Sequence, residues 1–472
     1  MNKNARRLCA SVLVPALFLT ALTLSGCMVG PNFVPPRTAV PAEWTGVQKA
    51  SAGQTSVATA GESDLTRWWR QFNDPTMTAL VEEAVKANLD LKNAQAVLRQ
   101  ARASRGVAVA GLWPSASASA GYERVHNAGT SGGENLFQAG LDAVWELDLF
   151  GGVRRGVESA DAGIVAAAEG LRDVQVSVVA EVALDYIQLR GYQQEIIVAK
   201  NNLTAQRRTA DITRKQFNVG FADALDVANA DSVVATTEAQ IPVYETGERQ
   251  AIYALSVLLA RPPADLLEQL SPPGSLPEVP AEVPAGLPSD LLRRRPDIRQ
   301  SEAQLHAATA QIGVAVADFF PKFTLTGTVN ENSNLLQTWW SKSCRSLGIG
   351  PSVSWPIFQG GAIASNVRIQ KALRDQAFIT YRKNVLAALQ DVENALIAFT
   401  NEQRHRKALT EAVAANRKAV DLSTLLYTEG QVDFLNVVTA ELSLYTAENA
   451  LVQSNINIAT DIIALYKALG GG

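Results

Sequence analysis

The sequence predicts an α+β membrane protein in which a transmembrane β-barrel, shared between subunits, continues into long coiled-coil helices. Three observations predict this fold class. One structural unit occurs twice in the chain, each copy contains paired segments with period-two hydrophobicity, and apolar residues recur every three or four positions over very long stretches. The 472 residues are 47% hydrophobic and 19% charged, a composition that excludes general disorder.

The internal repeat is clearest in the pentapeptide Gly106–Ala110, which recurs letter for letter as Gly313–Ala317. Later landmarks recur in the same order, namely Trp145 and Trp355, Gly220 and Gly430, Asp223 and Asp433, and Leu225 and Leu435. An ordered series of this kind indicates duplication rather than chance. We divide the mature chain into a first repeat at 63–260, a proline-rich linker at 261–288 and a second repeat at 289–472.

Each repeat is expected to contain one helix, a pair of strands and two further helices. In the first repeat, the first helix follows a single apolar seam over Met77–Ala101. Apolar and polar residues then alternate, which predicts strands whose two faces meet different environments. The alternating segments are at 115–123, 137–148, 323–330 and 346–355.

A soluble sheet with one buried face would show the same alternation, but two features favour a membrane. The segments have roughly the ten residues that a tilted strand needs to cross a bilayer. Aromatic residues also lie where strands meet helices, as in an interfacial girdle. They are Trp113, Trp145, Phe150, Phe319, Phe320, Trp355 and Phe358. Four strands cannot close a barrel, since the smallest barrels have about eight, so the barrel must be shared between subunits.

Long helical runs follow each strand pair, and the longer ones would reach ~100 Å at 1.5 Å per residue. Such lengths favour coiled-coil packing over an ordinary globular core. The last run has a heptad seam from Leu435 to Tyr466 in which Asn449 is the polar member and is expected to fix register. The runs are at 153–219, 222–260, 362–429 and 432–469.

The turns between the long helices are Asn218–Asp223 and Thr428–Asp433. Their glycines are typical of helix C-caps, and their aspartates are typical of the first turn of the next helix. Helix capping is therefore a sufficient structural account of both aspartates.

Composition and motifs argue against an enzyme, a metal protein or a nucleic-acid-binding protein. The formal net charge of -4 gives no positive field. The arginine cluster Arg293–Arg295 is expected to make structural contacts before a helix that begins at Pro296. The three histidines lie far apart, and we find no phosphate-binding loop, zinc-protease motif or nucleophile elbow. Cys9 and Cys27 lie near the amino terminus, which leaves Cys344 without an evident disulfide partner. We expect no catalytic residue, no metal and no cofactor.

The amino terminus predicts secretion and lipid attachment. Basic residues precede an apolar run at 8–24, which Pro15 interrupts, and Leu-Ser-Gly-Cys follows at 24–27. A plain transmembrane anchor would need a longer uninterrupted run, whereas this order is typical of a signal peptide, here residues 1–26. The tetrad resembles a bacterial lipobox, so Cys27 is expected to become the lipid-modified (palmitate-bearing) amino terminus.

The same resemblance implies sorting to the outer membrane. Met28 follows the cysteine, where an aspartate would indicate retention at the inner membrane. Residues 27–62 are expected to form the lipidated N-terminal segment. No later apolar run approaches a spanning helix, so a mature protein that crosses the membrane must do so as a closed barrel.

Several short motifs occur in a characteristic order: Leu24–Cys27 with Gly30-Pro31 after it, Trp68–Pro75, Trp145–Gly151, Leu292–Ile298 and the two glycine turns. Together they resemble the outer-membrane factor family, TolC-like, in its lipoprotein branch of the NodT and OprM type. The resemblance covers essentially the whole mature chain.

This resemblance implies a homotrimer in which each chain gives four strands to one barrel and its long helices to a periplasmic tunnel. The tunnel would dock onto a periplasmic adaptor protein and an inner-membrane pump of the RND or MFS type. The protein would then be a passive, lipid-anchored outer-membrane duct that exports small toxic compounds.

The resemblance also places a gate at the helical tips. Carried over by motif, its residues are Tyr427, Asp433 and Leu435 in the second tip and Asp223, Leu225 and Asp226 in the first. Leu435 is the candidate for an apolar constriction, and Asp226 is a further acidic contributor. Relatives often carry an acidic residue four positions after the tip leucine, where this chain has Thr439.

Two other functions fit the same residues. One is the outer-membrane duct of a type I protein-secretion system, which would differ in its inner-membrane partner. The other is a structural periplasmic lipoprotein with coiled coils and no conducting pore.

Overall fold

A computed structural model describes residues 28–45, 57–59, 65–126, 133–280, 282–284 and 288–471. The predicted signal peptide and the predicted lipid attachment site, Cys27, lie outside the described residues. The chain forms two compact units, each assembled from separate stretches. Among the described residues, the first unit takes those within 28–37, 98–167 and 300–381, and the second takes those within 38–97, 168–299 and 382–471.

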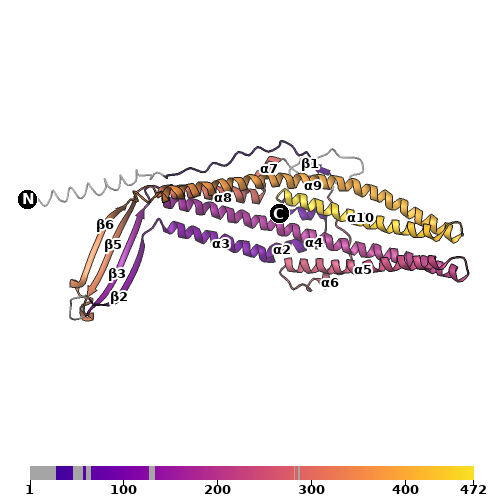
Figure 1. Ribbon diagram of the computed structural model, residues 1–472, viewed down its shortest axis with the longest axis horizontal. Coiled ribbons are helices and arrows are strands. Elements are labelled where there is room, and N and C mark those ends of the chain that lie inside the picture. The colour runs from indigo at the N-terminus through magenta and orange to yellow at the C-terminus, as the bar shows by residue number, and fades with distance from the viewer. Residues whose placement is uncertain are drawn as a thin grey trace, which may run out of the picture. The chain divides into compact units, whose positions relative to one another are not determined.

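The first unit contains a four-stranded antiparallel sheet in the order β2-β3-β5-β6 (Figure 1). The strands are β2 Ser115–Val125, β3 Glu134–Leu147, β5 Lys322–Ser333 and β6 Arg345–Ser354. All four predicted strands are confirmed. The central β3–β5 pairing joins the hairpin of the first half to that of the second. Two short 3-10 helices, η2 Leu336–Thr338 and η3 Lys342–Cys344, connect β5 to β6.

Each half of the chain has helices of the same order and length. The pairs are α3 Leu89–Ala110 with α8 Pro296–Ala317, α4 Gly152–Asn218 with α9 Ala362–Thr428, and α5 Ala224–Leu258 with α10 Phe434–Ala468. Their lengths are 22, 67 and 35 residues in both halves. The four long helical runs are thus confirmed within a few residues. In the described part of the chain, no helix is both long and apolar enough to cross a membrane.

The prediction of one helix over Met77–Ala101 is wrong, because α2 Pro75–Ala87 ends there and α3 begins anew at Leu89. Asn88 separates them with an extended ψ of 137°. Its side-chain oxygen accepts from the backbone N–H of Asp90 and Leu91 at 2.8 and 3.1 Å. Asparagine satisfies the first free N–H groups of a helix in this way, which favours a new start over continuation. The apolar seam crosses this break and conceals it.

The buried core of the second unit includes residues from the beginning of the first repeat. The 3-10 segment η1 Leu65–Phe72 buries Trp68, whose ring stacks on Tyr466 at 5.1 Å between centroids and whose Nε1 donates to the Gly471 carbonyl at 3.2 Å. The short strands β1 Val57–Thr59 and β4 Glu282–Pro284 pair in parallel. Two short helices complete the unit, α6 Leu267–Leu270 and α7 Pro288–Arg294.

Candidate functional site

The first helical tip, between α4 and α5, is closed by hydrogen bonds at both helix ends. Gly220 has a φ of +84°, a backbone conformation that residues other than glycine rarely adopt. Its N–H donates to Phe217 O at 3.0 Å, and Phe221 N–H donates to Gln216 O at 2.8 Å, a Schellman ending. Asp223 then caps α5: its Oδ1 accepts from Asp226 N–H at 2.9 Å, and the Asp226 carboxylate accepts from Asp223 N–H at 3.4 Å.

The second tip, between α9 and α10, has the same helix ending but a different start. Gly430 has a φ of +74°, and Gln431 N–H donates to Leu426 O at 2.9 Å. Asp433 occupies the N-cap position of α10, yet its side chain makes no capping hydrogen bond. The capping account therefore holds for Asp223 and is wrong for the Asp433 side chain. The Asn436 N–H, which would donate to this side chain in a capped start, donates instead to the Asp433 carbonyl oxygen at 3.1 Å.

Tyr427 packs inside the tips rather than on their surface. It belongs to a buried cluster with residues from all four tip helices: Ala210, Ala230, Val233, Phe434, Val437 and Val438. The rings of Tyr427 and Phe434 lie 5.2 Å apart between centroids. Burial raises the pKa of the Tyr427 hydroxyl above its ordinary value. This residue thus holds the two hairpins together.

The tip leucines, in contrast, point away from this core. The exposed fractions are 65% for Leu225 and 64% for Leu435. The buried residues of α10 at the tip are Phe434, Val437, Val438 and Glu441. Phe434, Val437 and Glu441 each lie one position before a residue of the predicted seam. A helix drifts ~20° per heptad against a strict seven-residue repeat, so over the roughly four heptads of α10 the core side moves by about one residue. The seam is buried near Tyr466 and exposed at Leu435.

Behind the apolar cluster lies a buried carboxyl that the sequence analysis missed. Glu441 on α10 is buried, and the Thr209 hydroxyl of α4 donates to its Oε1 at 2.7 Å. Burial raises the pKa of Glu441, and the hydrogen bond from Thr209 partly offsets this. A helical pattern that starts from Phe434 and Val437, instead of from Leu435, places Glu441 on the core side of α10 and predicts that its side chain is buried.

Further polar contacts join α10 to α4, α5 and α9. Glu448 accepts from the Asn202 amide of α4 at 2.7 Å and from Arg417 of α9 at 2.6 Å. The Asn449 amide donates to the Tyr244 hydroxyl of α5 at 2.7 Å. Polar contacts of this kind have one favoured alignment, so they oppose sliding of α10 along its neighbours.

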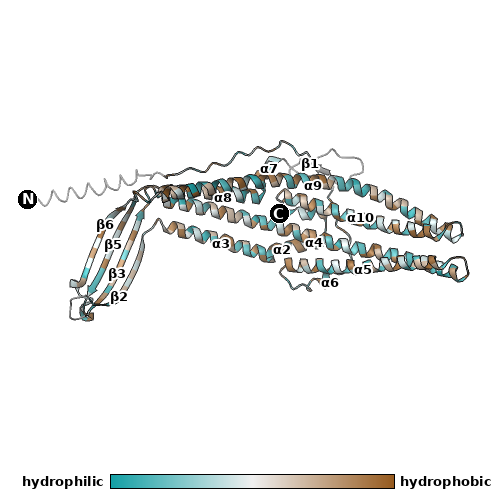
Figure 2. Cartoon of the chain, viewed as in Figure 1, coloured by the Kyte–Doolittle hydropathy of each residue, from teal (hydrophilic) through white to brown (hydrophobic). Residues whose placement is uncertain are grey.

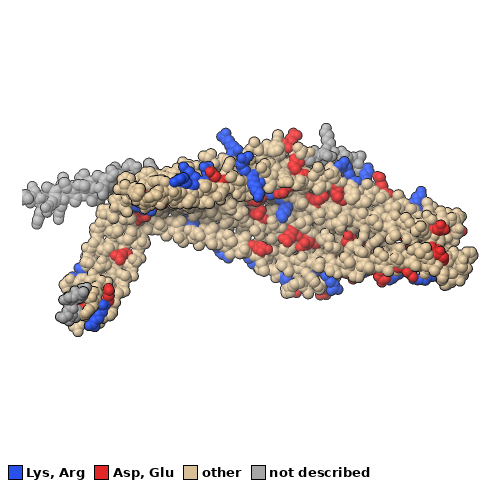
Figure 3. All heavy atoms as spheres, in the orientation of Figure 1, with Lys and Arg blue, Asp and Glu red and all other residues tan. Residues whose placement is uncertain are grey.

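The sheet of the first unit has an apolar and a polar face whose residues align across all four strands. One apolar row is Ala118–Leu141–Val329–Leu347, and the next is Ala116–Ala143–Gly327–Ile349. A polar row between them is Ser117–Asp142–Thr328–Gly348. The bands of alternating hydropathy are visible along the strands in Figure 2, and few charged side chains show over the middle of the sheet in Figure 3. Leu141, Leu347 and Ile349 are largely exposed in the single chain.

Tryptophans mark the end of the sheet where the helices begin. Trp145 Nε1 donates to Leu112 O, and Trp355 Nε1 donates to Phe319 O, each at 3.0 Å. The two halves thus use the same contact at the same place. Trp113 and Phe358 are exposed at these strand–helix junctions.

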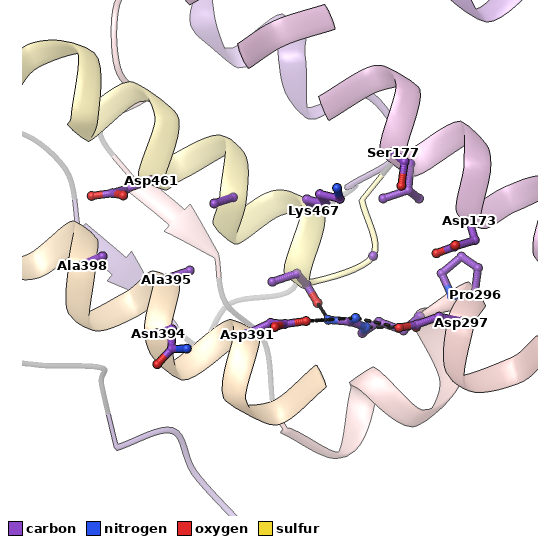
Figure 4. Close-up of a pocket in the computed structure, with 15 residues that line it drawn as sticks. Asp173, Ser177, Pro296, Asp297, Asp391, Asn394, Ala395, Ala398, Asp461 and Lys467 are labelled. Carbon is purple, nitrogen blue, oxygen red and sulfur yellow. Dashed lines mark hydrogen bonds and ion pairs between the residues drawn. The ribbon is translucent and has the colours of Figure 1, made fainter. Parts of the chain in front are cut away.

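A cavity of about 490 Å³ in the second unit lies between α4, α8, α9 and α10 (Figure 4). Arg295 bonds at its edge to Asp297 at 2.7 Å, to Asp391 at 3.2 Å and to Ala468 O at 2.9 Å, as expected of a structural arginine. Burial, aided by the charge of Glu402, raises the pKa of Asp461 to about 6. Within the described residues, no group of three or more His, Cys, Asp or Glu has an arrangement that would hold a metal ion.

The family model described as outer membrane efflux protein matches residues 80–261 and 287–471, one stretch in each half. The chain belongs to this family. The efflux protein is 33% identical to nodulation protein T of Rhizobium leguminosarum bv. viciae over 96% of its own length and 92% of the relative. It is 32% identical to the probable efflux pump outer membrane protein TtgC of Pseudomonas putida, covering 97% of this chain and 95% of the relative.

A solved structure of the outer-membrane channel OprN superposes on the efflux protein with a TM-score of 0.86, at 36% identity, over 94% of this chain and 99% of that one. A solved structure of CusC gives a TM-score of 0.79 at 26% identity over 94% and 100%. The protein is thus an outer-membrane efflux channel protein with the TolC-like fold, from a family of channels rather than enzymes.

Proposed function

We propose that the protein forms a homotrimeric, tripartite-system duct whose barrel takes four strands from each chain. The open edges of the sheet carry this proposal. β2 and β6 are its outer strands, and neither has a second partner among the described residues. Unpaired backbone groups are costly in a bilayer, and four strands cannot close on themselves. Pairing of β2 with β6 of a neighbouring chain closes the sheet, with the apolar rows facing lipid and the polar rows facing the lumen.

The equal lengths of the helices in both halves support an origin by internal duplication. The two helical hairpins of each chain then contribute equivalent walls to a periplasmic tunnel. The tips of these hairpins dock onto a periplasmic adaptor, and through it onto an inner-membrane pump of the RND or MFS type that supplies the energy.

Small toxic compounds are the proposed cargo. Relatives of this chain are named for toluene efflux, antibiotic efflux and pyoverdine export, all of which concern small molecules. These names favour efflux over the type I protein-secretion duct. Deletion of the gene should sensitise cells to several compounds in a broad toxicity panel; unchanged susceptibility, together with loss of a secreted protein, would favour secretion.

The oligomer and the pore are tested on the purified protein. Native mass measurement should give a trimer, and reconstitution into planar bilayers should give discrete conductance steps. Oligomers that open no pores would support the structural lipoprotein instead.

At the tips, Leu435 and Leu225 are proposed to form the apolar constriction, because both are exposed on the rim of the hairpins. Asp226 and Asp433 contribute acidic groups there. Tyr427 fixes the position of the second tip from inside the cluster, so it acts through packing rather than by lining the opening.

A further inference from the structure

The first described residues form an extended segment, Met28–Arg37, which we call the strap. Its Val29 N–H donates to Phe150 O at 3.1 Å. Further along, Gly30 lies against Gly313 of α8, and the Phe33 ring stacks on His306 at 4.4 Å between centroids. Three extended residues span ~10 Å and seven helical residues also span ~10 Å, so the strap follows α8 from its C-terminal end towards its N-terminal end.

Arg155 of α4 holds the strap. Its side chain is 1% exposed, and its guanidinium donates to Val29 O at 3.0 Å, to Gly30 O at 3.3 Å and to the Asn32 side chain at 2.8 Å. The remaining contact is with Glu158 at 2.7 Å. A buried guanidinium needs acceptors for its N–H groups, and the strap provides three of these four.

Two glycines allow this close approach. Gly30 has a φ of +88°, and a Cβ added there would collide with the Gly313 backbone. A Cβ on Gly313 would meet the Arg155 side chain at 2.7 Å. Gly106, the counterpart of Gly313 in the first repeat, has open space at this position. The repeated glycine is therefore used for strap packing in the second half alone.

The start of the strap lies at the strand–helix junction of the first unit. Met28 packs against Gly151, and Val29 bonds to the carbonyl of Phe150, directly after β3. The tryptophans that bond across this junction, Trp145 and Trp355, mark the same end of the sheet.

We propose that Arg155 is a positioning residue that docks the strap and thereby places the acylated end of the mature chain at the aromatic rim of the sheet. The placement of the acyl group rests on the proposed lipidation of Cys27, whereas the docking does not. The lipid then enters the same membrane surface as the aromatic side chains.

Docking is tested with a thiol-directed spin label on Val34→Cys, an exposed position, in a chain that also carries Cys344→Ser. The label should be immobile in the assembled protein and become mobile with Arg155→Met. Arg155→Lys, which retains the charge, should restore part of the immobile fraction. Arg154→Met is the matched control, because the neighbouring arginine bonds through its side chain to the carboxylate and carbonyl of Asp148.

An immobile label with Arg155→Met would overturn the proposal, as would equal mobility with Arg154→Met. If Arg155→Met does not assemble, Gly30→Ala and Asn32→Ala alter the strap alone and should release the label. If neither of these two substitutions releases the label, the proposal is also overturned. The number of labels bound per chain separates docking from lipidation. One label fits a processed chain whose Cys27 is blocked by lipid, whereas more than one would contradict lipidation. Docking would then be measured in a chain that also carries Cys9→Ala and Cys27→Ala.

Placement is tested with the label at residue 28 in protein reconstituted into phosphatidylglycerol and phosphatidylethanolamine vesicles. Oxygen, which concentrates in the bilayer, should relax this label more strongly than a water-soluble nickel complex does. At residue 34 the order should be reversed. Equal access of the nickel complex to both labels would contradict the placement at the membrane surface.

Discussion

At the scale of single residues, the two tips share a sequence pattern but differ in chemistry. All six tip residues expected from the family pattern lie at or beside the turns, yet their environments divide them. Tyr427 is in the core, the two leucines are exposed, and Asp223 caps its helix while Asp433 does not. Motif matching cannot make this distinction, because burial depends on which helices pack together.

Leu435→Ala should raise single-channel conductance, because it removes an exposed apolar side chain from the proposed constriction. Planar-bilayer recording of the purified protein measures this. Leu442→Ala is the matched control: it lies two turns further along the same exposed side of α10 and should leave conductance unchanged. Equal conductance of wild type and Leu435→Ala would remove this residue from the gate.

Asp223→Ala should loosen the first tip, because loss of an N-cap costs about 1 kcal/mol. Hydrogen exchange in the first turn of α5 should accelerate about fivefold. Asp433→Ala should leave the first turn of α10 nearly unchanged, since that carboxylate makes no capping bond. Equal acceleration at both tips would contradict the difference seen between the two caps.

Asp461 predicts a pH dependence of stability. Its pKa is raised from 3.8 to about 6 by burial, so the folded protein binds this proton more tightly than the unfolded chain does. The stabilisation is present at acidic pH and is lost as the pH rises through this window. Asp461→Asn should therefore raise the melting temperature most at pH 8 and progressively less towards pH 4. A constant difference across thermal melts from pH 4 to 8 would refute this.

At the scale of elements, the period of the hydrophobic pattern predicts the strands and long helices within a few residues. The prediction fails where a local polar group ends one helix and starts another, or where the core side of a helix rotates slowly along its length. The Asn88 cap divides a continuous seam into two helices, and the drift of α10 moves its core side from Leu435 to Phe434. The register between β3 and β5 cannot be predicted from the sequence either, because a period of two is compatible with several alignments of two hairpins.

Leu141→Arg should prevent stable assembly in the membrane. It introduces a charge into an apolar row that crosses all four strands, at a cost of roughly 2–4 kcal/mol if the row faces lipid. The assembled, heat-modifiable oligomer in isolated outer membranes measures this. Asp142→Arg, on the opposite face, should still assemble. If the two variants behave alike, the apolar row does not face lipid.

At the scale of the whole molecule, most of the predicted fold rests on the internal repeat. Because the strand-pair pattern occurs twice, each copy supports the prediction of the other. The family model likewise matches one stretch in each half of the chain. The way in which separate stretches build two compact units was not predictable, because both units draw on both repeats.

Cys27→Ser should abolish incorporation of labelled palmitate into the protein in growing cells. Loss of the thiol removes the proposed attachment atom, while Cys344→Ser, far along the chain, should leave the label unchanged. Palmitate that persists in Cys27→Ser would place the lipid elsewhere or exclude it.

The unequal caps of the two tips have a consequence for recognition. In the proposed trimer, the hairpin tips would form a ring in which carboxylates engaged in capping alternate with carboxylates that are not. Such a ring would have two kinds of contact point despite its repeated backbone. A partner that recognises the charge pattern would bind once per chain, whereas a partner that recognises only the backbone would bind twice. The binding ratio thus reports whether recognition distinguishes side chains or shape.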